Sequence, residues 1–263
     1  HVRLKYACPC CREHVRTAAL PAQPLPKSNA SPGLLAYVAT SKYADALPLY
    51  RQTTMFVRIG AKLSRSTLAT WMVGAGELVR PLIELLREQM LEQDYLQSDE
   101  TTLQVLKEPG RAAEAKSYLW CVRAMAPERP VVFFHYDSRR SGEAAKALLG
   151  EYRGYLQTDG YEGYNGLVAQ NGLTHVLCFA HARRYFIEAL KALGLNPKKL
   201  PDKPPDKARR TLKGLGFIRQ LYAIEQRIRG RPPDERRRIR IEESQPVLDR
   251  LRAWLDDTRP NVP

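Results

Sequence analysis

Two aspartates stand in nearly the same short phrase and could together bind a divalent cation. Asp99 lies in "YLQSDETTLQV" and Asp159 in "YLQTDGYEGY", sixty residues later (159 − 99 = 60). Each follows a short apolar-aromatic run that is typical of a strand. Coincidence is the alternative explanation, because aspartate is common where strands give way to turns.

If these strands are parallel neighbours in one sheet, their ends point the same way and the two carboxylates meet. Mg²⁺, or Mn²⁺ in its place, suits such a pair, because Mg²⁺ takes oxygen ligands, keeps several waters and bridges to phosphate. Two such ions can activate an attacking oxygen and stabilise the leaving oxygen of a phosphodiester. Gly160, directly after Asp159, would let a phosphate backbone come close. We therefore predict a metal site formed by Asp99 and Asp159.

The elements that must position these carboxylates follow from the spacing of the apolar residues. A period of two indicates strands, and a period of three or four indicates helices. The pattern predicts strands at 95–106, 115–125, 129–137, 154–159 and 174–179, helices at 141–152 and 180–193, and a short helical or turn segment at 160–172. The order β-β-β-α-β-α-β-α predicts an α/β protein with a mixed sheet. The three successive strands should be antiparallel, and the strands reached through helices parallel.

Residues 29–91 show a helical pattern that precedes the predicted sheet. The stretch "FVRIGAKLSRSTLATWM" reads as a helix, a glycine turn and a second helix capped by Ser64. This is compatible with a DNA-binding helix-turn-helix whose second helix presents Arg65 and Ser66 near its start. A small structural helical bundle is the alternative.

The composition favours a folded protein with a polyanionic partner. The chain has 263 residues, 44% of them hydrophobic, and a formal net charge of +14. Such an excess of positive charge favours nucleic acid, with an unspecific basic surface as the alternative. No apolar stretch is long enough to span a membrane. The start "HVRLKYACPC" has no signal-peptide core and no initiator methionine, so we expect a segment of a longer cytoplasmic protein.

The cysteines do not resemble a secreted disulfide framework, because three of the five stand together in "CPCC". Cys8 and Cys11 form a Cys-x-x-Cys pair that could supply half of a Zn²⁺ site, with Cys10 as a substitute. A structural zinc site needs four ligands, and His1 and His14 could contribute.

The phrase "CFAHARR" places Cys178 and His181 three residues apart, directly after the last predicted strand. His181 could contact a DNA phosphate near the metals, with Arg183 and Arg184 as electrostatic clamps. A buried cysteine and a histidine that packs the helix are the alternative.

The remaining residues, 194–263, predict a basic helical segment with proline interruptions. Its runs "RRTLK", "RIRGR" and "ERRRIR" are either solvated helix faces or sequence-blind phosphate contacts.

These motifs together resemble one family, the DDE transposases of bacterial insertion sequences, in particular the insertion sequence 66 (TnpC-type) group. The similar stretches, in the same order, are "KYACPCC", "KYADALPLYRQ", "LSRSTLATWM", "SDET", "TDGYEGYN" and "CFAHARRYF". The resemblance implies a ribonuclease H-like catalytic core in which Asp99 and Asp159 are the first two acids of a triad. It also implies transposon-end and target DNA as partners, a homo-oligomer on DNA, helper proteins from the same element, and an upstream cysteine pair that completes the zinc site.

The third acid of the triad is harder to place. In the resembling family it is a glutamate in an "NNxxER"-like segment after a helical insertion, and no such phrase occurs here. We therefore expect it beyond Pro263, with Glu225 in "LYAIEQ" as the second choice. For Glu225, an exposed residue of a charged helix is the alternative. Without the glutamate, this chain should bind metal poorly and should not catalyse strand transfer alone.

The sequence thus predicts four segments. They are a partial zinc-ribbon-like segment and linker (1–28), a helical region (29–91), a catalytic core (92–193) and a basic helical insertion (194–263). The predicted function is metal-dependent cleavage and strand transfer at transposon ends. The alternatives are a non-catalytic DNA-binding module or remnant of the same fold, and a metal-dependent nuclease.

Overall fold

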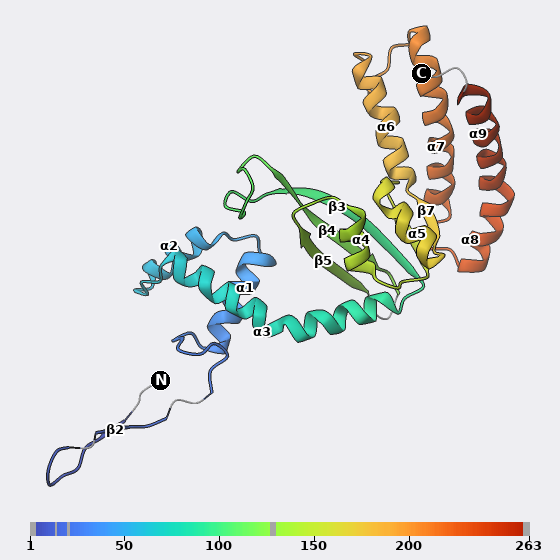
Figure 1. Ribbon diagram of the computed structural model, residues 1–263. Coiled ribbons are helices and arrows are strands. Elements are labelled where there is room, and N and C mark those ends of the chain that lie inside the picture. The colour runs from blue at the N-terminus through green and yellow to red at the C-terminus, as the bar shows by residue number, and fades with distance from the viewer. Residues whose placement is uncertain (1–3, 14, 20–21, 127–129, 260–263) are drawn as a thin grey trace. The chain divides into compact units, whose positions relative to one another are not determined.

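The structure is a computed structural model that describes residues 4–13, 15–19, 22–126 and 130–259 (Figure 1). The chain divides into two compact units, residues 1–89 and residues 90–263, and each is described by itself. The four segments predicted from the sequence remain a prediction.

The first unit contains a short hairpin and a group of helices. Its elements are β1 (Lys5–Tyr6), β2 (Arg16–Thr17), α1 (Pro32–Tyr43), α2 (Leu49–Arg58) and α3 (Arg65–Leu91), the last of which runs across the boundary. The strands β1 and β2 pair antiparallel. Leu35, Val38, Phe56, Leu68 and Trp71 belong to one buried cluster that holds α1, α2 and the start of α3 together.

The turn between α2 and α3 forms for local reasons. Gly60 has a φ of +80°, a conformation that L side chains rarely adopt, so α2 ends there. Ser64 then caps α3, because its hydroxyl accepts the backbone N–H of Thr67 at 3.0 Å. The predicted helix, glycine turn and helix are therefore present. Their role in binding DNA remains a prediction.

The second unit is built on a five-stranded mixed sheet. Its strands are β3 (Tyr95–Gln104), β4 (Lys116–Ala124), β5 (Val131–Asp137), β6 (Tyr155–Thr158) and β7 (Thr174–Leu177). They lie side by side in the order β5-β4-β3-β6-β7. The first three are antiparallel, while β6 is parallel to β3 and β7 is parallel to β6. The predicted strand directions are confirmed, and the element order is compatible with a ribonuclease H-like fold.

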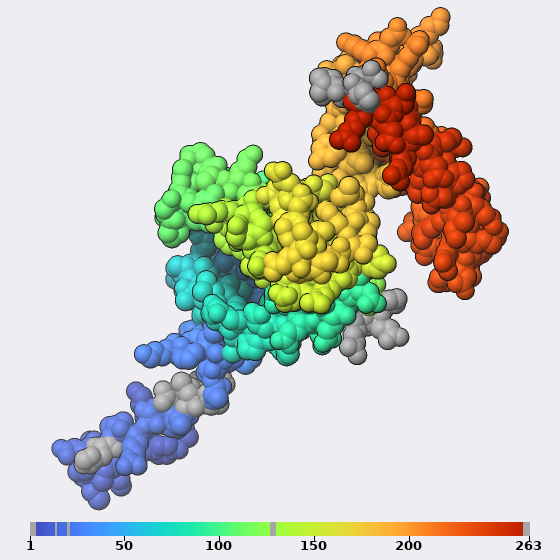
Figure 2. All heavy atoms as spheres, turned by 45° about the vertical axis from the view of Figure 1, so that its right-hand side comes forward, coloured from blue at the N-terminus to red at the C-terminus, as the bar shows by residue number. Residues whose placement is uncertain are grey.

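Short helices cover one face of this sheet. They are α4 (Gly142–Leu149), the 3₁₀ turn η1 (Glu162–Tyr164) and α5 (Asn165–Asn171). Leu148 and Leu167 from these helices join Leu96, Trp120 and Leu156 from the strands in one buried cluster. In Figure 2 this helical segment forms a yellow-green to yellow layer of side chains. On the opposite face Val132, Phe134 and Tyr136 of β5 are exposed.

Helices make up the rest of the second unit. They are α6 (Phe179–Ala192), the 3₁₀ turn η2 (Asp206–Ala208), α7 (Arg209–Arg227), α8 (Pro233–Ile239), the π-helical turn η3 (Arg240–Ser244) and α9 (Gln245–Thr258). Helix α7 packs against both α6 and α9 (Figure 1). Among the helices of the described chain, none has the length and apolar character that crossing a membrane requires.

The entry into β6 depends on a glycine, which gives a first prediction. A Cβ added at Gly154 would clash with the Tyr152 hydroxyl and with the backbone oxygen of Asp94, so a side chain must displace the start of β6 from β3. We expect Gly154→Ala to lower the free energy of unfolding by about 1–3 kcal/mol in urea denaturation. The matched control is Gly166→Ala in α5, where an added Cβ meets no atom within 4 Å. An equal effect of the two substitutions would contradict the close approach at Gly154.

Candidate functional site

The two copies of the repeated phrase lie on neighbouring parallel strands, β3 and β6. In the parallel ladder between β3 and β6, Tyr95 is opposite Tyr155, and the next two residues continue at the same sixty-residue offset. Asp99 and Asp159 stand at the same offset, two positions beyond the last paired residues, Gln97 and Gln157. The side-chain amide of Gln97 donates to Gln157 Oε1 at 2.6 Å, which supports this register. The two aspartates are therefore level with each other.

Three carboxylates meet at this point. Asp99, Glu100 and Asp159 each offer an oxygen, and the three oxygens lie within 4.8 Å of one another. Asp99 has 58% of its side chain exposed, Asp159 16% and Glu100 only 1%. The structure thus brings together the two aspartates singled out from the sequence. It adds Glu100, which sequence reasoning missed because neighbouring residues of a strand normally point to opposite faces.

Asp99 opens into a cavity on the sheet face opposite α4. The sheet register places it in one row with Cys121 and Phe134. The cavity has a volume of about 240 Å³. It is lined by Gln97, Ser98, Asp99, Cys121, Arg123, Gln157, Thr158, Cys178 and His181.

His181 enters this cavity from the start of α6. Its Nε2 lies 3.6 Å from Asp99 Oδ2. Its Nδ1 is buried and has no hydrogen-bond partner in the described part of the chain. His181 therefore lies beside one of the two aspartates, and its contact with a DNA phosphate remains a prediction. Arg183 and Arg184 follow on the exposed surface of α6.

Arg140, in the turn between β5 and α4, connects two of the carboxylates. Its guanidinium donates to Asp159 Oδ2 at 2.7 Å and to Glu100 Oε2 at 2.9 Å. The other oxygen of Glu100 accepts a hydrogen bond from the hydroxyl of Tyr164. Burial raises the pKa of Glu100, and the hydrogen bonds from Tyr164 and Arg140 oppose that rise. Burial and the neighbouring Glu100 carboxylate raise the pKa of Tyr164 well above its ordinary value, so its hydroxyl remains a donor.

The other acidic candidate, Glu225, lies outside this carboxylate group. It stands on α7, where Arg240 donates to both of its oxygens at 2.7 Å. These hydrogen bonds lower the pKa of Glu225, which therefore stays ionised. The structure places Glu225 in an ion pair of the helical segment and not beside Asp99 and Asp159.

The cysteine cluster lies in the loop between β1 and β2. Backbone hydrogen bonds from Cys11 and Cys10 lower the pKa of the Cys8 thiol. Within the described ranges, Cys8 and Cys11 are not joined by a third metal-binding side chain. His1 and His14 lie outside the described residues. Zinc binding at this cluster remains a prediction.

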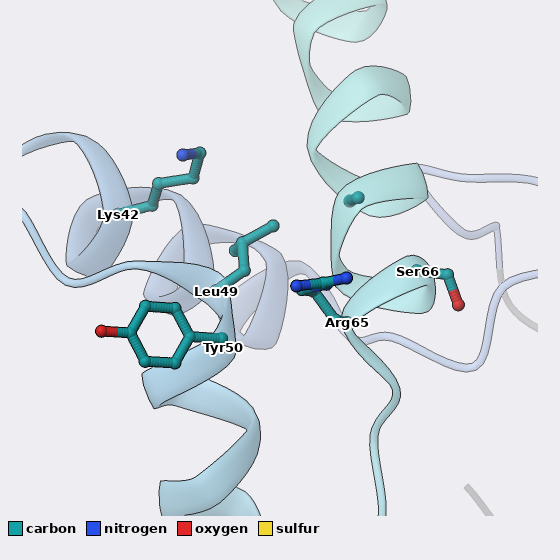
Figure 3. A pocket seen from close by; sticks show the side chains of 6 residues that line it. Lys42, Leu49, Tyr50, Arg65 and Ser66 are labelled. Carbon is teal, nitrogen blue, oxygen red and sulfur yellow. The ribbon is translucent and has the colours of Figure 1, made fainter. Parts of the chain in front are cut away.

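Arg65 and Ser66 line a separate cavity of about 530 Å³ in the first unit. Lys42 of α1 and Tyr50 of α2 also line it (Figure 3). Two cationic residues and two residues with hydroxyl groups therefore border one hollow surface. This arrangement suits a phosphate group better than a cationic or apolar ligand.

The carboxylate group fits a hard divalent cation. All of its donors are carboxylate oxygens, which Mg²⁺ and Mn²⁺ prefer. Asp99 and Asp159 would hold the ion, because both retain exposed surface. Glu100 is the poorer ligand, because only 1% of its side chain is exposed.

The fold and the site define an α/β protein that carries clustered carboxylates where two parallel strands meet. Residues 27–263 match the family described as "Transposase IS66 family", and the chain belongs to this family. It is also similar to three proteins of Sinorhizobium fredii (strain NBRC 101917 / NGR234) that are named only as uncharacterized.

Two of these relatives are y4jD and y4qI, each 31% identical to this chain. The match with y4jD covers 99% of this chain and 50% of the relative, and the match with y4qI covers 91% and 44%. The third, y4hP, is 29% identical over 98% of this chain and 48% of its own length. The chain thus spans about half the length of the relatives it matches.

The buried hydroxyl of Tyr164 gives a prediction for stability. Tyr164→Phe would leave a buried oxygen of Glu100 without its donor, which costs about 1–3 kcal/mol. We expect a loss of that size in the free energy of unfolding. The matched control is Tyr155→Phe, at a half-exposed tyrosine, where we expect a change below about 0.5 kcal/mol. Equal stability of the wild type and Tyr164→Phe would contradict the network described for Glu100.

Proposed function

We propose that this chain is the catalytic region of a DNA transposase that performs metal-dependent cleavage and strand transfer at transposon ends. The observation that supports this most strongly is the in-register pairing of β3 and β6, which sets Asp99 and Asp159 side by side. Membership of the IS66 transposase family supports the same reaction class. Asp99 and Asp159 would hold Mg²⁺ or Mn²⁺. When bound, such ions activate the attacking water or 3′-hydroxyl and stabilise the leaving oxygen.

His181 has the position of a substrate contact. It borders the Asp99 cavity, and 17% of its side chain is exposed. An Nε2–H donor there can bind a phosphate oxygen next to the cation, while Asp99 remains available as a ligand. Arg183, an exposed residue of the same helix, would extend the positive surface along α6.

A second basic surface lies between α6, the following loop and α7. A cavity of about 310 Å³ there is lined by four cationic side chains and by no acidic one. The four are Arg183, Lys191, Lys198 and Arg219. All four are exposed. Phosphates of a DNA backbone match this surface, because they require positive charge without base-specific geometry.

The catalytic proposal is tested by nicking. We expect the wild-type chain to nick DNA that contains transposon ends in the presence of Mn²⁺ or Mg²⁺. Asp99→Asn and Asp159→Asn should each lower the nicking rate by about 100-fold or more, because they remove a metal ligand without changing side-chain size. Asp249→Asn, on α9, is the control and should nick like the wild type.

Three outcomes would contradict the proposal. DNA binding without metal-dependent nicking would identify a non-catalytic DNA-binding module. Equal nicking by the wild type and Asp159→Asn would remove the catalytic proposal altogether. In the longer protein that would also supply the third acid, cleavage without joining of the 3′ end to target DNA would indicate a nuclease.

The basic surface gives a prediction for the salt dependence of DNA binding. Each lost phosphate contact lowers the slope of log K against log salt concentration by about 0.9. We expect the double substitution Lys191→Gln/Arg219→Gln to lower this slope by about 1.8, measured by fluorescence anisotropy on duplexes of any sequence. Arg238→Gln is the control, because Arg238 is already paired with Glu242. An unchanged slope in the double variant would place the DNA elsewhere.

A further inference from the structure

We propose that Arg140 is a positioning residue for Asp159 and that the buried Glu100 serves as its anchor. This inference rests on the proposed function, because it concerns how the chain orients a carboxylate toward a divalent cation.

Both oxygens of Asp159 are held by the protein. The backbone N–H of Tyr161 donates to Oδ1 at 2.8 Å, and Arg140 donates to Oδ2 at 2.7 Å. Rotation of the carboxylate would break one of these hydrogen bonds. Each carboxylate oxygen has two lone pairs, so each keeps a position free for a cation. The contacts therefore orient Asp159 without consuming its ability to act as a ligand.

Arg140 is itself held from several sides. Its Nε and its terminal nitrogen donate to Glu100 Oε2 at 3.3 and 2.9 Å. Its guanidinium carbon lies 3.9 Å from the ring centroid of Tyr161, in cation–π geometry. The hydroxyl of Tyr161 donates to the backbone oxygen of Arg140 at 2.7 Å. These contacts place the guanidinium in one position, and a lysine could not reproduce them.

Glu100 stands behind Arg140 and faces the core. Only 1% of its side chain is exposed, and Tyr164, which is fully buried, donates to its second oxygen. The Tyr164 hydroxyl also lies 2.8 Å from Ser98 Oγ. The anchor is thus fixed by side chains of β3 and η1, the elements that flank the site.

The charges explain why an arginine and a glutamate occur together. A lone guanidinium next to Asp159 would repel a bound divalent cation. Glu100 cancels that positive charge, so the pair orients Asp159 and leaves its negative charge for the cation. Partners outside the ligand shell that orient a metal ligand typically contribute 10–100-fold to metal affinity.

The test is a Mn²⁺ titration of the full chain, with free Mn²⁺ measured by electron paramagnetic resonance. The proteins are the wild type, Arg140→Lys, Glu100→Gln and Arg139→Lys. Arg139 is the matched control, an exposed arginine next in the chain. We expect Arg140→Lys and Glu100→Gln to keep the number of Mn²⁺ sites and to raise the dissociation constant about 10–100-fold. Arg139→Lys should titrate like the wild type.

A purely structural role for Arg140 would give a different result. Unfolding of part of the sample lowers the number of sites and leaves the dissociation constant unchanged, and that result would overturn the inference. An unchanged titration of Arg140→Lys would overturn it as well. If circular dichroism shows that Arg140→Lys does not fold, the nearly isosteric Glu100→Gln decides by the same criterion.

A separate arm of the experiment tests the proposed function. Asp99→Asn is titrated beside the other variants. Mn²⁺ binding that is the same in Asp99→Asn and in the wild type would contradict the metal site itself. A wild-type site that needs Asp99 but tolerates Arg140→Lys would contradict only the role of Arg140.

Discussion

The parallel, in-register pairing of β3 with β6 is the constraint on which the site depends. A shift of one residue in this ladder would turn the side chains of β6 to the opposite faces of the sheet and separate Asp159 from Asp99. The register is held by the buried Leu96 and Leu156 and by the hydrogen bond between Gln97 and Gln157. The two similar stretches thus pair residue by residue, and identical residues lie opposite each other in the ladder.

Alternation along β3 divides the site into two sides with different tasks. Asp99 points to the open face, where His181 and a cavity border it. Glu100 points to the face covered by α4 and η1, where it is buried and paired with Arg140. An exposed carboxylate, Asp99, and a buried carboxylate, Glu100, can therefore be consecutive residues of one strand. Asp159 accepts a hydrogen bond from Arg140, and one of its oxygens lies within 4.8 Å of oxygens of both Asp99 and Glu100.

The sequence predicted much of this arrangement, and the failures have clear causes. The succession of strands and helices along the chain, the strand directions and the approach of Asp99 to Asp159 follow from apolar periodicity and from one repeated phrase, which are local signals. The hydrogen bonds that join Glu100, Arg140 and Asp159 have no local signal in the sequence, because Arg140 lies in a turn, 40 residues from Glu100 and 19 from Asp159. Glu225 illustrates the opposite case. A helical glutamate was a reasonable candidate for the third acid, yet a basic helix offers many partners, and Arg240 binds it.

The charge distribution links DNA binding to cation binding in the proposed function. A net charge of +14 attracts the DNA backbone to the chain as a whole, but Asp99 and Asp159 repel a phosphate at the place where it must react. Arg140 cannot remove this repulsion, because its charge is already balanced by Glu100. A phosphate and the carboxylates can therefore approach each other only with cations between them, so the DNA should raise the affinity for the cations and the cations the affinity for the DNA by the same factor. In the proposed function, the buried Glu100–Arg140 pair would thus keep the site dependent on metal, since an arginine without its glutamate would partly replace the cation.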